Sequence, residues 1–589
     1  LLTELAASNP GTCVLTSRAA VADLAVFEGT TLVQVQLENL APDAGVRLLA
    51  SMGVAESGGG GEMRSAVASF AGHALALTLL GSYLADVHGG DVRPWREVGP
   101  LQDEQRMGGH ARRVMRAYEE WLGDGPEVSV LRLLGLFDRP AEPGAIRALR
   151  QAPPIAGLTD LLPPAGAWRQ TLAKLRAAAL LSDPNPAERD SLDTHPLIRD
   201  YFGERLRLQS PAAWRAGNER LYHYFTQGAE EFPQTLREMA PLYSAVSHGR
   251  EAGFPERAYR EIYERRIQQG KYFAFRSLGS AAVDLACLSR FFESPWEELK
   301  PGLDAYTQAT IFNQVGVFLR AVGRLPEAIQ ATEQAVALRT AAGEWKDAVL
   351  NATNLSEMAV LVGDLQRARS AAEQSLDYAD RSGDSLSVVI SRSAVGAVLH
   401  QLGRIPEALE LFAGAEAREI SRGHGLHFLY SLRGFQYADC LLDHGRADEV
   451  EERARTTRVW AEERKNLLDM GLGSVLLARA FLSRERAPEA LDHVTQAVDL
   501  LHAADVLHHH VRARLVRAAV YRSLGRLDEA DGDLDMVQRY SSHLGLRLHA
   551  VDGELERARV RLAQGDEAAA RAQLATAEEA ILALRYGRR

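Results

Sequence analysis

Three adjacent histidines, His508, His509 and His510, are the residues whose types most directly suggest chemistry, because imidazole is a common metal ligand. Consecutive side chains of a helix point in different directions, however, and no carboxylate or cysteine pattern flanks the triplet. We therefore expect a solvated position between repeats and no metal site. The cysteines lie far apart and are expected as small core residues of a reducing, cytoplasmic protein. They are Cys13, Cys287 and Cys440.

The pattern of the 589 residues supports few other kinds of chemistry. No Ser/His/Asp or Cys/His order indicates a hydrolase. The phosphate-binding loop GxxxxGKS or GxxxxGKT does not occur, so we expect no catalysis, and in particular no ATP hydrolysis, from this chain alone. A net charge of −11 argues against nucleic acid as the main partner. No apolar run reaches the roughly 18 residues that a membrane span needs.

The strongest pattern is a turn that recurs about every 40 residues in the second half of the chain. A glycine that accepts left-handed backbone ends one helix, Pro or Asp begins the next, and an alanine five residues after the glycine lets the two helices approach. One such hairpin cannot bury its apolar face alone, so we expect the units to stack into a superhelical solenoid. The turns begin at Gly323, Gly363, Gly403, Gly445, Glu485, Gly525 and Gly565.

The repeated unit resembles a tetratricopeptide repeat (TPR). In the first unit Gly316, Ala328 and Ala335 stand where that repeat has small residues, and Phe312 stands where it has a large one. The resemblance covers residues 306–589. It implies about seven TPR-like hairpins with longer helices than usual.

In stacked TPR hairpins the first helix of each unit lines the concave face. Counting back from the repeated alanines places seven polar residues there: Asn313, Arg320, Glu357, His400, Asp439, Arg479 and Arg522. One interpretation is a groove for a protein or peptide ligand, and the other is a solvated groove without a ligand. Reversal of Arg479 and Arg522 to Glu is expected to abolish activation with little effect on melting.

The first half contains features of a different kind. Gly11-Thr-Cys-Val-Leu-Thr-Ser-Arg18 reads as a buried strand of a parallel sheet with an arginine at its carboxyl end. Ala71-Gly-His-Ala-Leu-Ala-Leu77 begins an apolar helix. Residues 111–208 read as three helices, a two-stranded wing over 180–194 and a last helix that begins within Thr194-His-Pro-Leu-Ile-Arg199. That order is a winged helix.

These features, followed by repeats, resemble the C-terminal part of a bacterial STAND-class P-loop NTPase, the class that includes NB-ARC and NACHT proteins. By that resemblance Arg18 is the sensor arginine near the terminal phosphate, and His195 contacts the ADP β-phosphate. Gly72, His73 and Ala74 form the turn against the adenine, with Ala74 where the family has Pro. The usual Asp after the histidine is replaced by Pro196. The resemblance implies ADP or ATP with magnesium in the full-length protein, and no cofactor held by this chain alone.

The expected fold is mainly α, with a remnant of an α/β P-loop domain, a helical domain, a winged helix and an α-solenoid. The expected domains are 1–36, the P-loop remnant; 37–110, the helical domain; 111–208, the winged helix; 209–305, a divergent helical connector; and 306–589, the TPR-like repeats.

The resemblance implies the sensor and regulatory portion of a signalling ATPase. The solenoid would bind a protein or peptide trigger, and the winged helix and helical domain would hold ADP in a closed state. Release of that state would allow homo-oligomerisation and effector activation, with bacterial defence as a setting. Two alternatives stay open: a TPR protein-interaction scaffold and a STAND-type transcriptional regulator. No membrane partner is expected.

Overall fold

We determined the architecture from a computed structural model of the chain. It describes residues 11–17, 31–56, 61–98, 109–186, 190–423, 425–504 and 506–589, with residue 188 and isolated positions before residue 31. The chain divides into two compact units. The smaller comprises Gln34–Glu231 and Glu238–Tyr263, and the larger comprises Leu1–Val33, Phe232–Arg237 and Glu264–Arg589.

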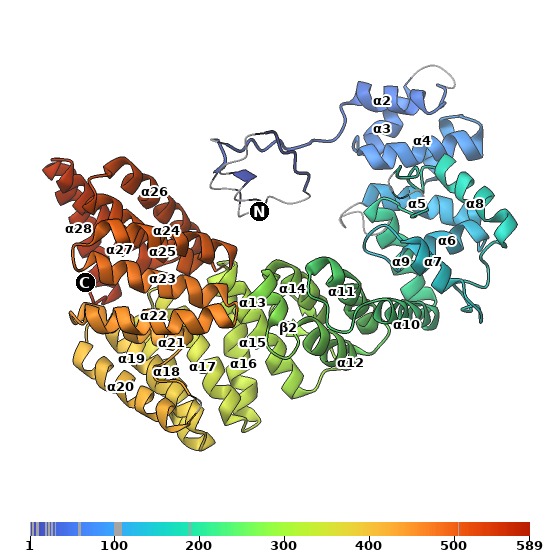
Figure 1. Ribbon diagram of the computed structural model, residues 1–589. Coiled ribbons are helices and arrows are strands. Elements are labelled where there is room, and N and C mark those ends of the chain that lie inside the picture. Colours follow the sequence, from blue (N-terminus) through green and yellow to red (C-terminus); the bar gives the residue numbers. More distant parts are fainter. Residues whose placement is uncertain are drawn as a thin grey trace. The chain divides into compact units, whose positions relative to one another are not determined.

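The larger unit contains a solenoid of antiparallel helix pairs, which confirms the expected mainly helical fold (Figure 1). The first helices of successive hairpins are α15 (Ala305–Ala321), α17 (Trp345–Leu361), α19 (Ser385–Gln401), α21 (Ser431–Asp443), α23 (Leu467–Leu482), α25 (Leu507–Ser523) and α27 (Arg547–Ala563). The second helices are α16 (Leu325–Ala341), α18 (Leu365–Ser382), α20 (Ile405–Ser421), α22 (Ala447–Glu463), α24 (Ala487–Ala503), α26 (Leu527–Leu544) and α28 (Glu567–Leu584).

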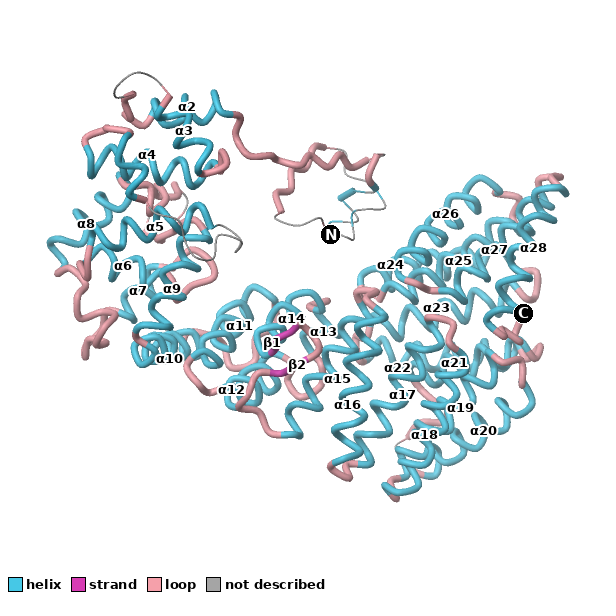
Figure 2. The backbone as a smooth tube through the Cα atoms, turned by 180° about the vertical axis from the view of Figure 1, so that it is seen from behind, coloured by secondary structure: helices cyan, strands magenta, loops and turns pink. Residues whose placement is uncertain are grey.

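Short turns join the two helices of each hairpin (Figure 2). The six glycines that begin these turns have φ between 73° and 84°, the left-handed region that glycine adopts at low cost. Glu485 takes the same place in the fifth turn with φ of 62°, so this turn keeps its geometry without a glycine. The residue five positions further on is buried in every hairpin, as the sequence predicted. These residues are Ala328, Ala368, Ala408, Val450, Ala490, Ala530 and Ala570.

The solenoid curves far enough for its last hairpins to pack against its first ones. A Cβ atom added to Gly323 would come within 2.0 Å of the Leu544 side chain. Leu325 and Leu361 share a buried apolar cluster with Leu544, and α17 contacts α27 directly. The inner helices therefore surround a common space.

The smaller unit consists mainly of short helices. They are α2 (Pro42–Ser51), α3 (Glu62–Ser69), α4 (Ala74–His88), the 3-10 helix η2 (Arg93–Glu97), α5 (Gly109–Leu122), α6 (Pro126–Leu134), α7 (Pro143–Leu149), α8 (Ala165–Ala177), α9 (Pro196–Gln209), α10 (Pro211–Gln227), α11 (Leu236–Glu251, which begins in the larger unit) and α12 (Pro255–Arg257). Helices α6 and α9 approach backbone to backbone, since a Cβ atom on Gly135 would lie 2.4 Å from the Gly203 nitrogen. The helix order predicted for the winged helix is present.

The predicted two-stranded wing, however, is not formed. One hydrogen bond joins the Ser182 N–H to the Asp193 carbonyl at 2.8 Å, but the described residues of 180–194 contain no strand. Leu192 instead forms an antiparallel bridge with Ala141. This bridge explains the difference, because the N–H and the carbonyl of Leu192 are both paired with Ala141 and not with residues 180–182.

The predicted connector, residues 209–305, is divided between the two units. Helices α10 and α12 belong to the smaller unit, whereas α13 (Phe273–Leu278) and α14 (Ala281–Leu288) belong to the larger. The segment also contains elements that the sequence did not predict. They are the π-helix η3 (Ala258–Ile267), the 3-10 helix η4 (Ser289–Phe291) and a hairpin of β1 (Phe292–Ser294) and β2 (Glu298–Leu299).

The apolar run near the start of the chain is not the buried strand that the sequence predicted. Residues 11–17 have no regular secondary structure and are exposed. A lone strand has no neighbour to complete its backbone hydrogen bonds, so burial does not follow from an apolar sequence alone. Cys13 is therefore exposed, whereas Cys287 and Cys440 are buried as expected. Arg18 lies outside the described residues.

Candidate ligand-binding site

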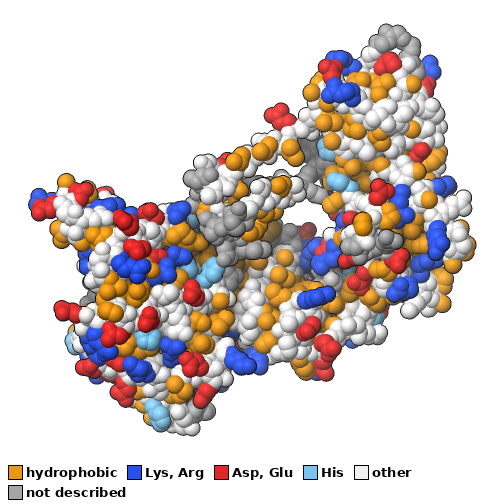
Figure 3. Space-filling view, turned by 45° about the horizontal axis from the view of Figure 1, so that its top comes forward, with side chains coloured by type: hydrophobic (Ala, Val, Ile, Leu, Met, Phe, Trp, Pro, Cys, Tyr) orange, Lys and Arg blue, Asp and Glu red, His pale blue; other side chains and the backbone are white. Residues whose placement is uncertain are grey.

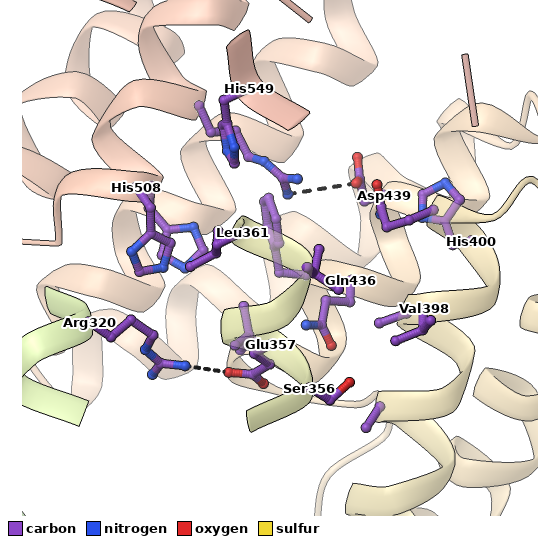
Figure 4. A pocket seen from close by; sticks show the side chains of 18 residues that line it. Arg320, Ser356, Glu357, Leu361, Val398, His400, Gln436, Asp439, His508 and His549 are labelled. Carbon is purple, nitrogen blue, oxygen red and sulfur yellow. Dashed lines mark hydrogen bonds and ion pairs between the residues drawn. The ribbon is translucent and has the colours of Figure 1, made fainter. Parts of the chain in front are cut away.

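A cavity opens on the inner side of the solenoid, between helices that are far apart in the sequence (Figure 4). Its empty volume is about 740 Å³ including the mouth. The wall is formed by residues of α15, α17, α19, α21, α25 and α27, so the cavity exists only because the repeats curve around it. Apolar side chains such as Leu361, Val398 and Phe435 share the wall with charged ones.

Four of the seven predicted groove residues line this cavity: Arg320, Glu357, His400 and Asp439. They interact with residues of other inner helices. The Arg320 guanidinium donates to Glu357 Oε2 at 2.6 Å, which joins α15 to α17 (Figure 4). His400 Nε2 and Asp443 Oδ2 are 2.9 Å apart and join α19 to α21. Residues on neighbouring inner helices therefore form a polar ladder.

The other three predicted residues belong to the same ladder but are not part of the cavity wall. The Asn354 amide donates to Asn313 Oδ1 at 3.1 Å, and the Arg522 guanidinium donates to Glu556 Oε1 at 2.6 Å. Arg479 forms ion pairs with Asp439 and with Asp443. A glutamate at position 479 would face these carboxylates. Charge reversal at Arg479 should therefore destabilise the fold, which corrects the prediction that melting stays nearly unchanged.

The most densely charged part of the inner surface is centred on Asp439, of which 2% is exposed. Three guanidiniums approach its carboxylate, those of Arg479, Arg512 and Arg588, the last two at 3.7 and 2.9 Å. Burial lowers the pKa of Arg512 to about 10, with a further contribution from the nearby charge of Arg588. Positive charge is thus crowded at this point.

The three adjacent histidines are buried, not solvated as the sequence predicted. Helix α25 carries them on the inner side of the solenoid, and His508 and His509 line the cavity. His510 is turned toward α24 and α26: its Nδ1 lies 3.2 Å from the Val498 carbonyl, and Arg514 donates to its Nε2. Curvature of the superhelix buries this face of α25, and the local sequence alone does not predict that burial.

Two cavity histidines have a buried nitrogen with no hydrogen-bond partner among the described residues. These are Nδ1 of His508 and Nδ1 of His549, whose residues are 9% and 7% exposed. Burial lowers the pKa of His549 to about 3, with a further contribution from Arg512, so the ring is neutral near pH 7. Burial also lowers the pKa of His508. Both rings can supply a hydrogen bond to a molecule in the cavity.

Basic and acidic side chains are interspersed on the face that Figure 3 shows. No group of three or more His, Cys, Asp or Glu residues could hold a metal ion in the part of the chain that the structure describes. No helix of that part is both long enough and apolar enough to cross a membrane.

The residues assigned to the nucleotide lie at the N-termini of two helices of the smaller unit. His73 caps α4, accepting the Ala76 N–H at its Nδ1, and Ala74 is exposed in the first turn. Gly72 has φ of 68° and lies against the Leu40 carbonyl, 2.2 Å from where its Cβ would be. His195 is exposed and caps α9, accepting the Leu197 N–H at 3.2 Å.

These residues do not by themselves make a nucleotide site. The side of Gly72 where a Cβ would project is filled by the Leu40 backbone, and the Nδ1 atoms of both histidines accept helix N–H groups. The 589 residues also contain no phosphate-binding loop. Ala74 and His195 are both exposed, and the helix end that carries His195 is fixed by the buried Arg199.

Sequence reasoning found the polar register of the inner helices but missed the side of the cavity that α25 and α27 form. His508, His509, Arg512 and His549 line it from α25 and α27, opposite the residues of the first hairpins. A count along the repeats could have placed Arg512 and His549 on inner helices. It could not have shown that the last hairpins return to face the first ones.

No protein-family model matches the chain, and none of the curated proteins compared does so. The structure is similar to that of a Signal Transduction ATPase with Numerous Domains (STAND) protein with a tetratricopeptide repeat sensor from Pyrococcus horikoshii. The sequence identity is 14% and the TM-score 0.39, over 95% of this chain and 76% of that one. It is also similar to a Rap protein complexed with competence and sporulation factor, at 14% identity and a TM-score of 0.40, over 60% of this chain and 88% of that one. Likenesses this distant assign neither a family nor a ligand.

Proposed function

We propose that this chain is the sensor and regulatory portion of a STAND-type signalling ATPase, whose solenoid binds a peptide or a short protein segment in its inner cavity. The observation that supports this most is the cavity wall itself. It combines apolar side chains with buried, unpartnered nitrogens of His508 and His549. A buried polar atom without a partner costs about 1–3 kcal/mol, which a bound peptide group would recover.

A peptide suits the cavity better than a metal or a small apolar molecule. Peptides present both backbone polar groups and side chains, and the wall offers Gln436 and Ser356 beside Phe435 and Leu361. The empty volume of about 740 Å³ includes the open mouth, so the wall can enclose only a short part of a peptide and not a folded domain.

A ligand in this position can act as a switch because both ends of the solenoid form the wall. Contacts with α15 and α17 on one side and with α25 and α27 on the other favour the curvature that brings these helices together. Binding energy then shifts the shape of the whole sensor, which is the requirement for coupling to a distant site.

For the smaller unit we propose that His195 contacts ADP in a protein that also carries a P-loop domain, and that this contact favours a closed state. Release of ADP would then permit homo-oligomerisation. The test is nucleotide retention by the full-length protein: the His195→Ala variant should lose ADP faster than the unaltered protein during gel filtration. Equal retention would make His195 a helix cap only.

A protein-interaction scaffold is the second candidate, and the polar ladder is the observation that favours it. Pairs such as Arg320–Glu357 and Arg522–Glu556 are satisfied without a ligand. A scaffold would bind partners on its outer helices and would not respond to changes inside the cavity.

Peptide selection with a matched pair of variants separates the two candidates. A phage-displayed random peptide library is selected on the chain, and the affinities of selected peptides are measured by calorimetry. Ala397→Trp fills the cavity, whereas Ala337→Trp places the same ring on the exposed side of α16. We expect Ala397→Trp to weaken binding at least about tenfold and Ala337→Trp to leave it unchanged. Peptides that bind both variants equally well would contradict the sensor proposal.

A further inference from the structure

Residues 586–589 follow α28 and lie across the inner surface like a bound peptide. Tyr586 is 1% exposed, and its hydroxyl lies 3.3 Å from Asp552 Oδ2. Gly587 passes so close to α19 that an added Cβ would lie 2.3 Å from the Leu402 carbonyl oxygen. The Arg588 N–H then donates to the Gln401 carbonyl at 3.1 Å. Both backbone and side chains of the segment are therefore recognised.

The Arg588 side chain makes the most specific of these contacts. Its guanidinium donates to Asp439 Oδ1 at 3.0 Å and lies 2.9 Å from Asp439 Oδ2, while its Nε donates to Asp443 at 2.6 Å. Only 3% of the side chain is exposed. Asp439 and Asp443 thus hold the planar fork of an arginine from two directions, a geometry that lysine cannot reproduce. We call these two carboxylates, with the Gln401 carbonyl, the arginine seat.

The charges around the seat are balanced differently with and without the segment. The surrounding helices contribute three carboxylates, those of Asp439, Asp443 and Asp552, and two guanidiniums, those of Arg479 and Arg512. His400 remains neutral near pH 7, because burial lowers its pKa to about 4 with a further contribution from the charge of Arg588. The helices alone therefore have one negative charge in excess. Arg588 neutralises it, and Arg589, which pairs with Asp552 at 2.7 Å, adds one further positive charge.

The seat adjoins the cavity. Asp439 and Gln401 contribute to both, so a chain bound in the cavity would lie directly beside the seat. Because four residues tethered to α28 occupy the seat, an entering chain must compete with an internal group whose effective concentration is in the millimolar range. Extra contacts in the cavity would give an external peptide the advantage.

We propose that the arginine seat is the recognition site for an arginine-bearing peptide, and that residues 586–589 occupy it as an internal competitor. The inference rests on the proposed function, since it names the class of peptide that the solenoid binds. The partner is a basic peptide whose arginine replaces Arg588 between Asp439 and Asp443, and whose neighbouring residues enter the cavity.

A labelled copy of the segment tests the seat directly. The probe is a fluorescein-labelled synthetic peptide with the sequence Leu-Arg-Tyr-Gly-Arg-Arg, and binding to the 589-residue chain is followed by anisotropy. We expect the Arg588→Ala/Arg589→Ala variant to bind the probe at least about tenfold more tightly than the unaltered chain. Addition of Asp443→Asn should remove that gain, and a probe with alanine in its fifth position should not bind.

Arg588→Lys provides a second variant that keeps the charge and avoids the risk of misfolding. It should bind the probe more tightly than the unaltered chain but less tightly than the double alanine variant, because lysine holds the seat without the fork. Failure of the probe to bind any of these variants, each with an unchanged circular dichroism spectrum, would make residues 586–589 a structural clasp and overturn the inference.

The library-selected peptides distinguish failure of this inference from failure of the proposed function. Peptides that require the cavity but lack arginine, and do not compete with the probe, would overturn the arginine seat and leave the sensor function standing. Selected peptides that bind the Ala397→Trp variant as tightly as the unaltered chain would contradict the sensor function itself. Peptides enriched in arginine that displace the probe would support both.

Discussion

The inner helices of the solenoid and the first turns of its outer helices use the same residue types in opposite ways. On the outer helices an Arg and a Glu three residues later pair within one helix start, as in Arg486–Glu489 and Arg526–Glu529, with side chains that are 44–48% exposed. On the inner helices the pairs join different repeats and are mostly buried, as in Arg320–Glu357. Arg588 and Asp439 represent the extreme, with each side chain 3% exposed.

The difference shows that position, not composition, decides what an ion pair does. An exposed pair is screened by water and contributes at most about 1 kcal/mol. A buried pair has lost its hydration, so removal of one partner leaves a charge that nothing compensates. The inner face is therefore sensitive to any change in charge, which is what a ligand-responsive surface requires.

The largest effect should come from pH, because it reaches all the buried histidines of the solenoid together. Burial lowers the pKa of each below the ordinary 6.5, to about 4 for His400 and about 3 for His510 and His549. The nearby charges of Arg588, Arg512 and Arg514 act in the same direction, against the attraction of Asp443 for His400.

Below pH 6.5 these histidines are protonated in the unfolded chain but stay neutral in the folded chain. The free energy of unfolding should therefore fall as the pH drops from 6.5 toward 4. The expected slope is about 1.4 kcal/mol per pH unit for each histidine. Urea unfolding at several pH values measures it, and His549→Gln should reduce the slope by one proton. A stability that stays flat from pH 7 to pH 5 would show that these rings are hydrated.

The next largest effect should follow from Asp439→Asn. This substitution leaves Arg479, Arg512 and Arg588 crowded around a neutral group, and we expect a loss of about 3–5 kcal/mol in the free energy of unfolding. The matched control is Asp448→Asn on α22, whose side chain is 98% exposed and pairs with Arg484. It should change stability by less than about 0.5 kcal/mol. Similar losses for both variants would remove the distinction between the two faces.

A smaller change of the opposite sign is expected at Glu485. Its φ of 62° belongs to the left-handed region, where a residue with a Cβ is less stable than glycine by about 1 kcal/mol. Glu485→Gly should therefore raise the free energy of unfolding by up to that amount, measured by urea denaturation. The same substitution at the exposed Glu463, inside the last turn of α22, should lower it. Destabilisation by Glu485→Gly would mean that this turn differs from the other six.

The smallest effect is expected for the outer pair Arg526–Glu529. Single and double alanine substitutions should give a coupling energy of about 0.3–0.5 kcal/mol that decreases in 1 M salt. A double-mutant cycle measures this quantity. A coupling energy above about 2 kcal/mol would place the outer pairs in the same class as the inner ones.

The repeats were predictable because each hairpin is specified locally. Glycine in a left-handed turn and a small residue five positions later recur at a constant spacing, and the helices begin and end where that pattern requires. Even Glu485 could be aligned, since the rest of its turn fits. The polar register of Arg320, Glu357, His400 and Asp439 followed from the same spacing.

What sequence reasoning missed depends on contacts between parts of the chain that lie far apart in sequence. His508 reads as a surface residue until the superhelix closes over it, and nothing near Arg588 in the sequence predicts Asp439 as its partner. The wing failed for the same kind of reason, since Leu192 pairs with Ala141 and not with residues 180–182. Residues 11–17 read as a buried strand, but burial depends on neighbouring strands as well as on apolar side chains.

The central claim is that the inner cavity of the solenoid is the ligand site, and histidine resonances report on it most directly. The chain is labelled with ¹³C at histidine Cε1, and spectra are recorded with and without a library-selected peptide, with assignments from His→Gln variants. We expect the signals of His508, His509 and His549, which line the cavity, to shift on binding while that of the exposed His543 on α26 does not. A peptide that binds with full occupancy and leaves the signals of His508, His509 and His549 in place would contradict the claim.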